Sequence, residues 1–193
     1  MDLRSDRLNR LGSVMDSALN SEDPHADVGI TCDPRDPSHG SRLGNGPHSS
    51  IDDMRSTSGY YFTLGSSIFS WSSKKQETVA QSTAEAEFIA ATAAVNQALW
   101  LRTILMDLNL EQKESTEIFV DNQAAIAISH NPVFHGKIKH FNIKLFFLRE
   151  VQKEELVTLI YCNSEDQLAD LFTKPLPVSK FEFLRQKLGV RSS

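Results

Sequence analysis

The stretch Gln81–Leu105, QSTAEAEFIAATAAVNQALWLRTIL, predicts a long helix with two glutamates in its first turns. Its alanines and larger apolar residues favour close packing on a sheet. Ser82 and Glu85 have the spacing of a capping box, in which Ser82 accepts from the amide of residue 85 and Glu85 reaches back to the amide of Ser82. Glu87 lies about 200° away from Glu85 around the helix, so it cannot share that role. Glu87 is therefore either a solvated first-turn glutamate favoured by the helix dipole or a functional residue.

The composition is that of an ordinary globular protein. The chain has 193 residues, a hydrophobic content of 40% and a formal net charge of −5, which is enough for one domain with its own core. This charge gives no overall basic field, so nucleic-acid binding cannot be argued from charge. Cys32 and Cys162 have no metal-ligand spacing and favour a reducing compartment. We see neither an apolar run long enough to cross a bilayer nor a signal peptide, and expect a soluble intracellular protein, cytoplasmic or nuclear, without a membrane partner.

The composition changes near residue 50. Residues 1–50 are rich in Pro, Gly, Ser, Asp and His, which is typical of a segment that buries little. We therefore predict a poorly structured extension over residues 1–50 and a folded domain over residues 51–190. Within the extension, DVGITC at residues 27–32 alternates as a strand does.

After Ile51 the pattern becomes regular, and the elements follow one another closely. Their predicted order is β-β-α-β-α-α-β-α-α, which calls for an α/β sheet with helices packed on its faces. The predicted elements are a hairpin over 59–73, a helix over 83–108, a strand over 116–121, helices over 122–130 and 140–153, a strand over 156–162, and helices over 164–174 and 178–188. Pro175 terminates the helix over 164–174, and Gly189 is the expected stop of the last helix.

Two aspartates are further candidates for a functional site. Asp121 ends the apolar strand EIFVD where a strand meets a helix, and ligands gather at the carboxyl ends of strands in open α/β sheets. The alternative is that Asp121 caps the next helix, a task for which Asn122 is equally suited. Asp170 lies inside the helix predicted over residues 164–174. Together with Glu87 these acids predict a Mg²⁺ site, because that ion prefers carboxylate, water and phosphate oxygens.

Three ordered segments resemble the ribonuclease H domain at the end of copia-type LTR-retrotransposon polyproteins, a kind common in plants. They read DDMRSTSGYYFTLGSSIFSWSSKKQETVAQSTAEAEFIAATAA, FVDNQAAIAISHNPVFHGKIKHFNIKLFFLREV and DQLADLFTKPL, and the resemblance extends over residues 51–190. It implies a ribonuclease-H-like fold, a mixed five-stranded sheet flanked by helices. The family cleaves the RNA strand of an RNA–DNA hybrid with two Mg²⁺ ions, for which Mn²⁺ is a substitute, held by four acids.

The resemblance also implies roles for single residues. By motif, Glu87 matches the second metal-binding catalytic acid of the family, Asp121 the third and Asp170 the fourth. Hybrids are recognised in this fold through 2′-hydroxyls and phosphates. The candidate substrate contacts are polar residues near these motifs: Ser82, Asn122, Gln123, Lys139 and His140. Lys139 is equally well explained as an ordinary solvated lysine.

The chain departs from the family at its first strand. That strand has the form GYxDxDWAG, lies in the centre of the sheet and carries the first metal-binding aspartate, but this chain reads SRLGNGPHSSI directly before DDMRSTSGY. We therefore expect a domain that lacks this strand, with two strand edges left unpaired. One alternative is that DVGITCD, residues 27–33, supplies the strand and Asp33 the missing acid.

Three functions follow from this resemblance and this departure. The first is ribonuclease H-type hydrolysis during retrotransposon reverse transcription, with an RNA–DNA hybrid as substrate and a reverse transcriptase domain on another chain as a partner. The second is an inactive, retrotransposon-derived remnant, because metal-binding acids act as a unit and the loss of one lowers the rate greatly. The third is an interaction module that binds a partner strand at its exposed sheet edges.

Overall fold

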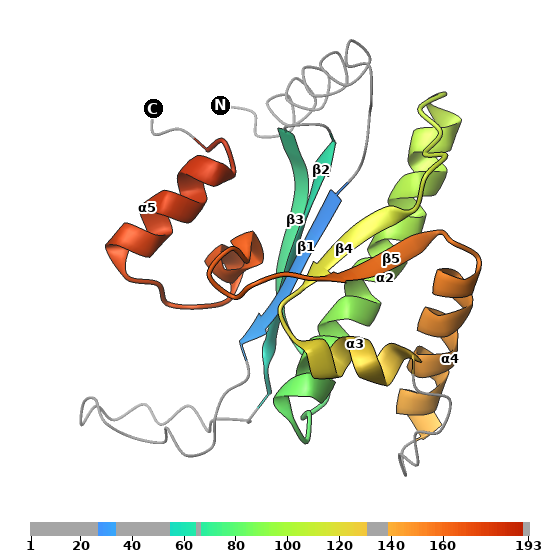
Figure 1. The fold of residues 1–193 in the computed structure, drawn as a ribbon, viewed down its shortest axis with the longest axis horizontal. Helices are drawn as coiled ribbons and strands as arrows, with labels where there is room; N and C mark the ends of the chain where they lie inside the picture. Colours follow the sequence, from blue (N-terminus) through green and yellow to red (C-terminus); the bar gives the residue numbers. More distant parts are fainter. Residues whose placement is uncertain (1–26, 34–54, 65–66, 131–138, 191–193) are drawn as a thin grey trace.

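The computed structural model describes residues 27–33, 55–64, 67–130 and 139–190, with the side chains of 27–33, 67 and 139–141 outside the description. Within these ranges five strands form one mixed sheet of order β3-β2-β1-β4-β5, with helices on both faces (Figure 1). The strands are β1 (Asp27–Asp33), β2 (Thr57–Leu64), β3 (Ser67–Lys75), β4 (Thr116–Val120) and β5 (Val157–Tyr161). The helices are α2 (Thr83–Asp107), α3 (Gln123–His130), α4 (Lys139–Lys153), the 3₁₀ helix η2 (Leu168–Phe172) and α5 (Val178–Lys187).

The central strand β1 comes from the segment that the composition assigned to the extension. β1 pairs antiparallel with β2, where Asp33 lies opposite Thr57, and parallel with β4, where Ile30 lies beside Val120. The expectation that the sheet lacks its central strand is therefore wrong, and the alternating DVGITCD segment supplies it. The folded unit accordingly reaches back to Asp27, well before residue 51. With β1 in place, the facing edges of β2 and β4 are paired, and the outer strands of the described sheet are β3 and β5.

Helix α2 is the main core helix and confirms the element predicted from Gln81–Leu105. Its N-cap is Ser82, whose Oγ accepts from the amide of Glu85 at 3.1 Å. The Glu85 carboxylate accepts from the amide of Gln81 at 2.7 Å, one residue before the amide that the capping box predicted. The first bond satisfies an orphan donor of the helix, and the second binds the residue before the N-cap, which explains Glu85 structurally.

The apolar composition of α2 suits a helix that packs tightly on a sheet. Ala90 and Ala94 are fully buried in one cluster with Ile118 and Val120 of β4, because methyl side chains let a helix backbone approach the strands closely. By length and composition α2 could also cross a bilayer, so the expectation of no such run is wrong. Core helices share this composition, and α2 contacts β1, β2 and β4 along the sheet.

Helices η2 and α5 lie on the opposite face of the sheet from α2, α3 and α4 (Figure 1). In place of the longer helix predicted over 164–174 there is a five-residue 3₁₀ helix. The Gln167 side chain caps it by accepting from the amide of Ala169, and the amide of Thr173 closes it on the carbonyl of Asp170 at 3.2 Å. Helix α5 is followed by Gly189 at φ 71°, so the predicted glycine stop is confirmed.

Glycine at position 59 allows η2 to pack directly on β2. A Cβ atom there would lie 2.6 Å from Cγ2 of Thr173 and 3.1 Å from Cβ of Phe172. Ser73 of β3, which is paired with Gly59, donates from Oγ to the carbonyl of Phe172 at 2.6 Å. The Tyr61 ring packs on the Phe172 ring with centroids 6.5 Å apart. These contacts fix η2, and with it Asp170, against the sheet.

Candidate active site

The ammonium of Lys174 contacts two of the predicted acids, and the charge of the third acts on it. Nζ of Lys174 lies 2.7 Å from Oδ1 of Asp170 and 3.8 Å from Oδ2 of Asp121. The charge of Glu87 also acts on Lys174, together with those of both aspartates. The fold thus brings together the three acids that the sequence singled out, and their roles as metal ligands stay predictions.

Glu87 is a buried carboxylate in the first turns of α2, with only 2% of its surface exposed. The reading as a solvated first-turn glutamate is therefore wrong. Burying a carboxylate is costly unless a positive charge or hydrogen bonds compensate for lost hydration. The Lys174 ammonium supplies positive charge nearby, and a bound divalent cation would supply more.

Asp121 directly follows β4, and its side chain is 12% exposed. Oδ1 of Asn122 accepts from the amide of Ala125 at 3.2 Å, so Asn122 serves as the cap of α3. The cap of α3 is therefore Asn122 and not Asp121. Asp121 lies instead at the carboxyl end of β4, where the Lys174 ammonium reaches it.

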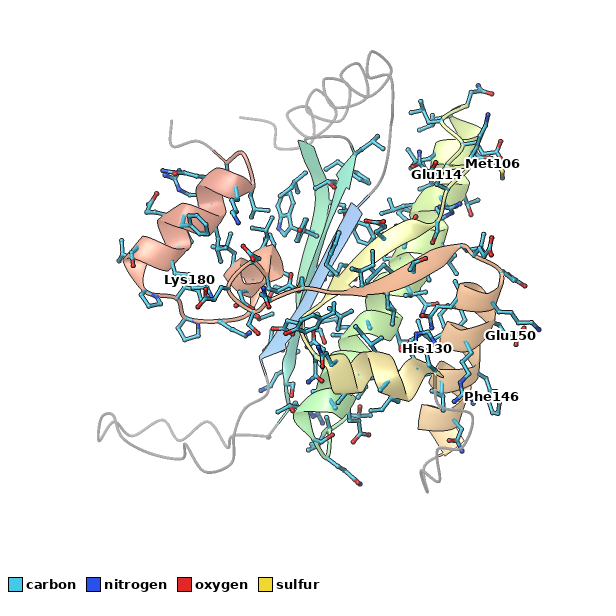
Figure 2. The ribbon with its side chains drawn as sticks, in the orientation of Figure 1. Met106, Glu114, His130, Phe146, Glu150 and Lys180 are labelled. Atoms are coloured by element: carbon cyan, nitrogen blue, oxygen red, sulfur yellow. The ribbon has the colours of Figure 1, made fainter. Side chains whose placement is uncertain are left out.

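Asp170 is buried in η2, with 1% of its surface exposed, and it pairs with two lysines. Lys174 contacts its Oδ1, and Lys180 of α5 lies 3.3 Å from its Oδ2. Figure 2 labels Lys180 on the part of α5 that faces η2. Lys180 also donates to the carbonyl of Ser164 at 3.3 Å. The sequence reasoning missed both lysines, although the four-residue spacing of Asp170 and Lys174 was a usable signal for an ion pair.

Gln167 links η2 to the strand that carries Asp121. Its Nε2 donates to the carbonyl of Phe119 and to Sγ of Cys162, each at 3.2 Å, while its Oε1 accepts from the amide of Ala169. The side chain is 1% exposed, so these bonds are made in the interior. Because Phe119 lies two residues before Asp121, Gln167 sets how far η2 stands from β4.

The electrostatics of the site are those of clustered negative charge. Burial by itself would lower the pKa of Lys174, but the hydrogen bond to Asp170 and the charges of Asp170, Asp121 and Glu87 raise it above its ordinary value. Burial foremost, and then the charges of the nearby acids, of which Asp121 acts most, together raise the pKa of the neighbouring thiol of Cys162 to about 12. The site therefore attracts cations and keeps a nearby thiol neutral.

The donor set fits a hard divalent cation. Three carboxylates supply oxygen ligands of the type that Mg²⁺ prefers, and the Lys174 ammonium stands between two of them as a cation. Where side chains are described, no three Asp, Glu, His or Cys residues are close enough to hold a metal ion in the present arrangement. A metal would thus require the Lys174 ammonium to move and the carboxylates to close around it.

The remaining candidates are the predicted substrate contacts and Asp33, and the structure describes the side chains of only some of them. Ser82 and Asn122 act as helix caps, and Gln123 is exposed at the start of α3. Lys139 and His140 begin α4, but their side chains lie outside the described residues. The Asp33 side chain is likewise not described.

The chain matches part of much longer known proteins. It is 37% identical over 143 residues to the retrovirus-related Pol polyprotein from transposon TNT 1-94 of Nicotiana tabacum, which covers 74% of this chain and 11% of the polyprotein. It is 36% identical over 139 residues to the corresponding polyprotein from transposon RE1 of Arabidopsis thaliana, covering 72% and 10%. The chain thus spans about a tenth of the length of these curated relatives. No protein-family model matches it.

Among solved structures, LC11-RNase H1 in complex with an RNA/DNA hybrid is similar over 77% of this chain and 93% of that chain, with 14% identity and a TM-score of 0.48. The family expectation of a mixed five-stranded sheet flanked by helices agrees with the strand order described above. The sequence relatives, at more than a third identity over most of the chain, carry the assignment. The chain is therefore homologous to one segment of the retrovirus-related Pol polyproteins of plant transposons.

Proposed function

We propose that this chain is a ribonuclease H-type nuclease domain of a copia-type retrotransposon, which hydrolyses the RNA strand of RNA–DNA hybrids with Mg²⁺ or Mn²⁺. The observation that carries the proposal is the ion pairing of Asp121 and Asp170 with one ammonium beside the end of β4, on which the charge of Glu87 also acts. Homology to Pol polyproteins supports it. Such a domain would act inside the cell, in the cytoplasm or nucleus, and its partner would be a reverse transcriptase domain.

The chain's own residues would prepare the site for metal-assisted hydrolysis. Glu87, Asp121 and Asp170 would hold the metal, which when bound lowers the pKa of a water and stabilises the departing 3′ oxygen. Gln167 keeps Asp170 at a fixed distance from β4, and Lys180 holds the second oxygen of Asp170. Water adds to phosphorus and the P–O3′ bond breaks, which leaves a 5′-phosphate and a 3′-hydroxyl. Exposed Gln123, with Lys139 and His140, would contact the hybrid.

The fourth acid would come from β1, and we assign it to Asp33. β1 runs parallel to β4, so both strands end at the same end of the sheet. Asp33 is the last residue of β1 and lies in register with Thr57 of β2. In parallel sheets ligands gather at this end, which supports Asp33 as the fourth acid beside Asp121. With the central strand present, the reason for a partner-binding module at unpaired inner edges is removed.

A cleavage assay tests the proposal. The purified chain is incubated with a labelled RNA–DNA hybrid and Mg²⁺, then Mn²⁺, beside Asp121→Asn and Asp33→Asn variants. Metal-dependent cleavage that is lost in the Asp121→Asn variant supports the proposal, and a parallel loss in Asp33→Asn supports the fourth ligand. If well-folded protein cleaves the hybrid with neither metal, the proposed nuclease function is wrong and the inactive remnant is favoured.

A further inference from the structure

We propose that Lys174 is a built-in counter-ion of the acid cluster, whose ammonium must be displaced before a divalent cation can bind. The inference rests on the proposed function, because it concerns the same three acids. It adds Lys174 to the site and states that the ammonium leaves before the metal ion binds. In the metal-free protein the Lys174 ammonium compensates the charge of the acids. When a metal ion binds, it replaces this ammonium.

The geometry places the Lys174 ammonium where a metal would compete for the same oxygen atoms. It lies 2.7 Å from Oδ1 of Asp170 and 3.8 Å from Oδ2 of Asp121, and it feels the charge of Glu87. A hard cation bound by these acids would need the same carboxylate oxygens. The two cations therefore exclude one another.

The burial of the acids explains why such a counter-ion is needed. Glu87 and Asp170 are 2% and 1% exposed, and buried charge that lacks compensation destabilises a fold strongly. Without a cation, the like charges of these carboxylates and Asp121 would repel one another. The Lys174 ammonium offsets this repulsion while the site holds no metal.

Lys174 is also able to leave. Its side chain is 28% exposed, and a lysine can move its charged head towards water while its aliphatic stem stays packed. It is anchored by the backbone at the end of η2, where the amide of Lys174 donates to the carbonyl of Asp170 at 3.0 Å. Displacement thus needs only side-chain rotation.

Lys180 provides a matched comparison within the same site. It contacts Oδ2 of Asp170 at 3.3 Å and the carbonyl of Ser164 at 3.3 Å. Lys180 forms an ion pair with Asp170, whereas Lys174 forms ion pairs with Asp170 and Asp121 and also interacts with the charge of Glu87. Removing Lys180 should therefore relieve competition for the metal much less than removing Lys174.

The test compares wild type, Lys174→Met and Lys180→Met by thermal unfolding and by Mn²⁺ binding, with free Mn²⁺ measured by electron paramagnetic resonance. We expect Lys174→Met to melt at lower temperature without metal and yet bind Mn²⁺ on the order of tenfold more tightly, equivalent to about 1.4 kcal/mol. Lys180→Met should also lose stability but show a smaller gain in affinity. A residue with a merely structural role would not combine lower stability with tighter metal binding.

A labelling experiment on the wild-type chain covers the case in which the variant does not fold. Amine-reactive ester labelling, read by mass spectrometry, should modify Lys174 faster with saturating Mg²⁺ than without it, while Lys187 stays unchanged as an internal control. Mn²⁺ binding by wild type with no gain in Lys174→Met, or with no change in Lys174 labelling, would overturn the counter-ion role alone. No Mn²⁺ binding by wild type or by Lys174→Met would overturn this role and the proposed metal site together.

Discussion

A Cβ atom on Gly59 would lie 2.6 Å from Cγ2 of Thr173, so β2 and the end of η2 meet at a point where there is room only for hydrogen. Thr173 in turn donates its amide to the carbonyl of Asp170 at 3.2 Å. The glycine therefore helps to set the position of a buried acid that belongs to a different part of the chain. The contact between Gly59 and Thr173 thus links the position of Asp170 to strand β2 of the sheet.

Replacing Gly59 with alanine should push η2 away from β2. Overpacking of a tight contact costs about 1–3 kcal/mol, and we expect a loss of that size in the free energy of unfolding measured in urea, with weaker Mn²⁺ binding. Gly189→Ala is the control, because Gly189 has open space around it but a φ of 71°. It should lower stability through backbone strain and leave Mn²⁺ affinity unchanged. Unaltered stability in Gly59→Ala would contradict the close contact.

Replacing Gln167 with methionine should loosen the link between η2 and β4. The variant loses the donated bonds to the Phe119 carbonyl and the Cys162 sulfur and the accepted bond from Ala169. Each buried group left without its partner costs about 1–3 kcal/mol. We expect lower stability in urea and weaker Mn²⁺ binding.

A matched glutamine tests whether the effect is local to the site. Gln152 of α4 makes one bond, from Nε2 to the Leu148 carbonyl at 3.3 Å. Gln152→Met should change stability little and Mn²⁺ affinity not at all. Equal effects of the Gln167 and Gln152 substitutions on metal affinity would rule out a positioning role for Gln167.

Arg102 should support the fold without affecting the site. Its guanidinium donates to the carbonyls of Gln112 and Glu114 and to Oγ1 of Thr116, and so fixes the segment that leads into β4. Lysine cannot reproduce this planar set of donors, so Arg102→Lys should lose about 1–3 kcal/mol in urea unfolding while Mn²⁺ affinity is kept. Arg185→Lys, at a partly exposed pair with Glu182, should lose less than about 1 kcal/mol. A comparable loss in both variants would contradict the role of Arg102.

The Cys162 thiol should resist alkylation in the folded protein. Burial and the neighbouring acids raise its pKa from 9.0 to about 12, so little thiolate forms at neutral pH. The folded state holds this proton more tightly than the unfolded state, so the associated stability is present below pH 9.0 and is lost as pH rises towards about 12.

Iodoacetamide rates measured against pH, in a Cys32→Ser background, check this expectation. The native rate should rise only at strongly alkaline pH, whereas the rate in urea should follow an ordinary thiol. Asp121→Asn should lower the native pKa, because the Asp121 charge helps to raise it. A native thiol that titrates at its ordinary value would refute this account of the site's charge.

The sequence by itself determined most of the local elements and singled out the three acids. The Ser82 and Glu85 capping signals placed the start of α2, and Asn122 was one of the two caps that the sequence offered for α3. These features follow from hydrogen bonds within one turn and from side-chain periodicity, which are short-range and can be read along the chain. Glu87, Asp121 and Asp170 were recognised by motif, before their surroundings were known.

Only the tertiary structure decided which strand occupies the centre of the sheet and what compensates the buried acids. β1 lies more than twenty residues before β2, and its place depends on pairing with both β2 and β4. The short 3₁₀ form of η2 depends on Gln167 and on the missing side chain at Gly59. The contact of Lys180 with Asp170 depends on where α5 packs. Each of these features depends on contacts between segments distant in the chain, which a local sequence pattern does not specify.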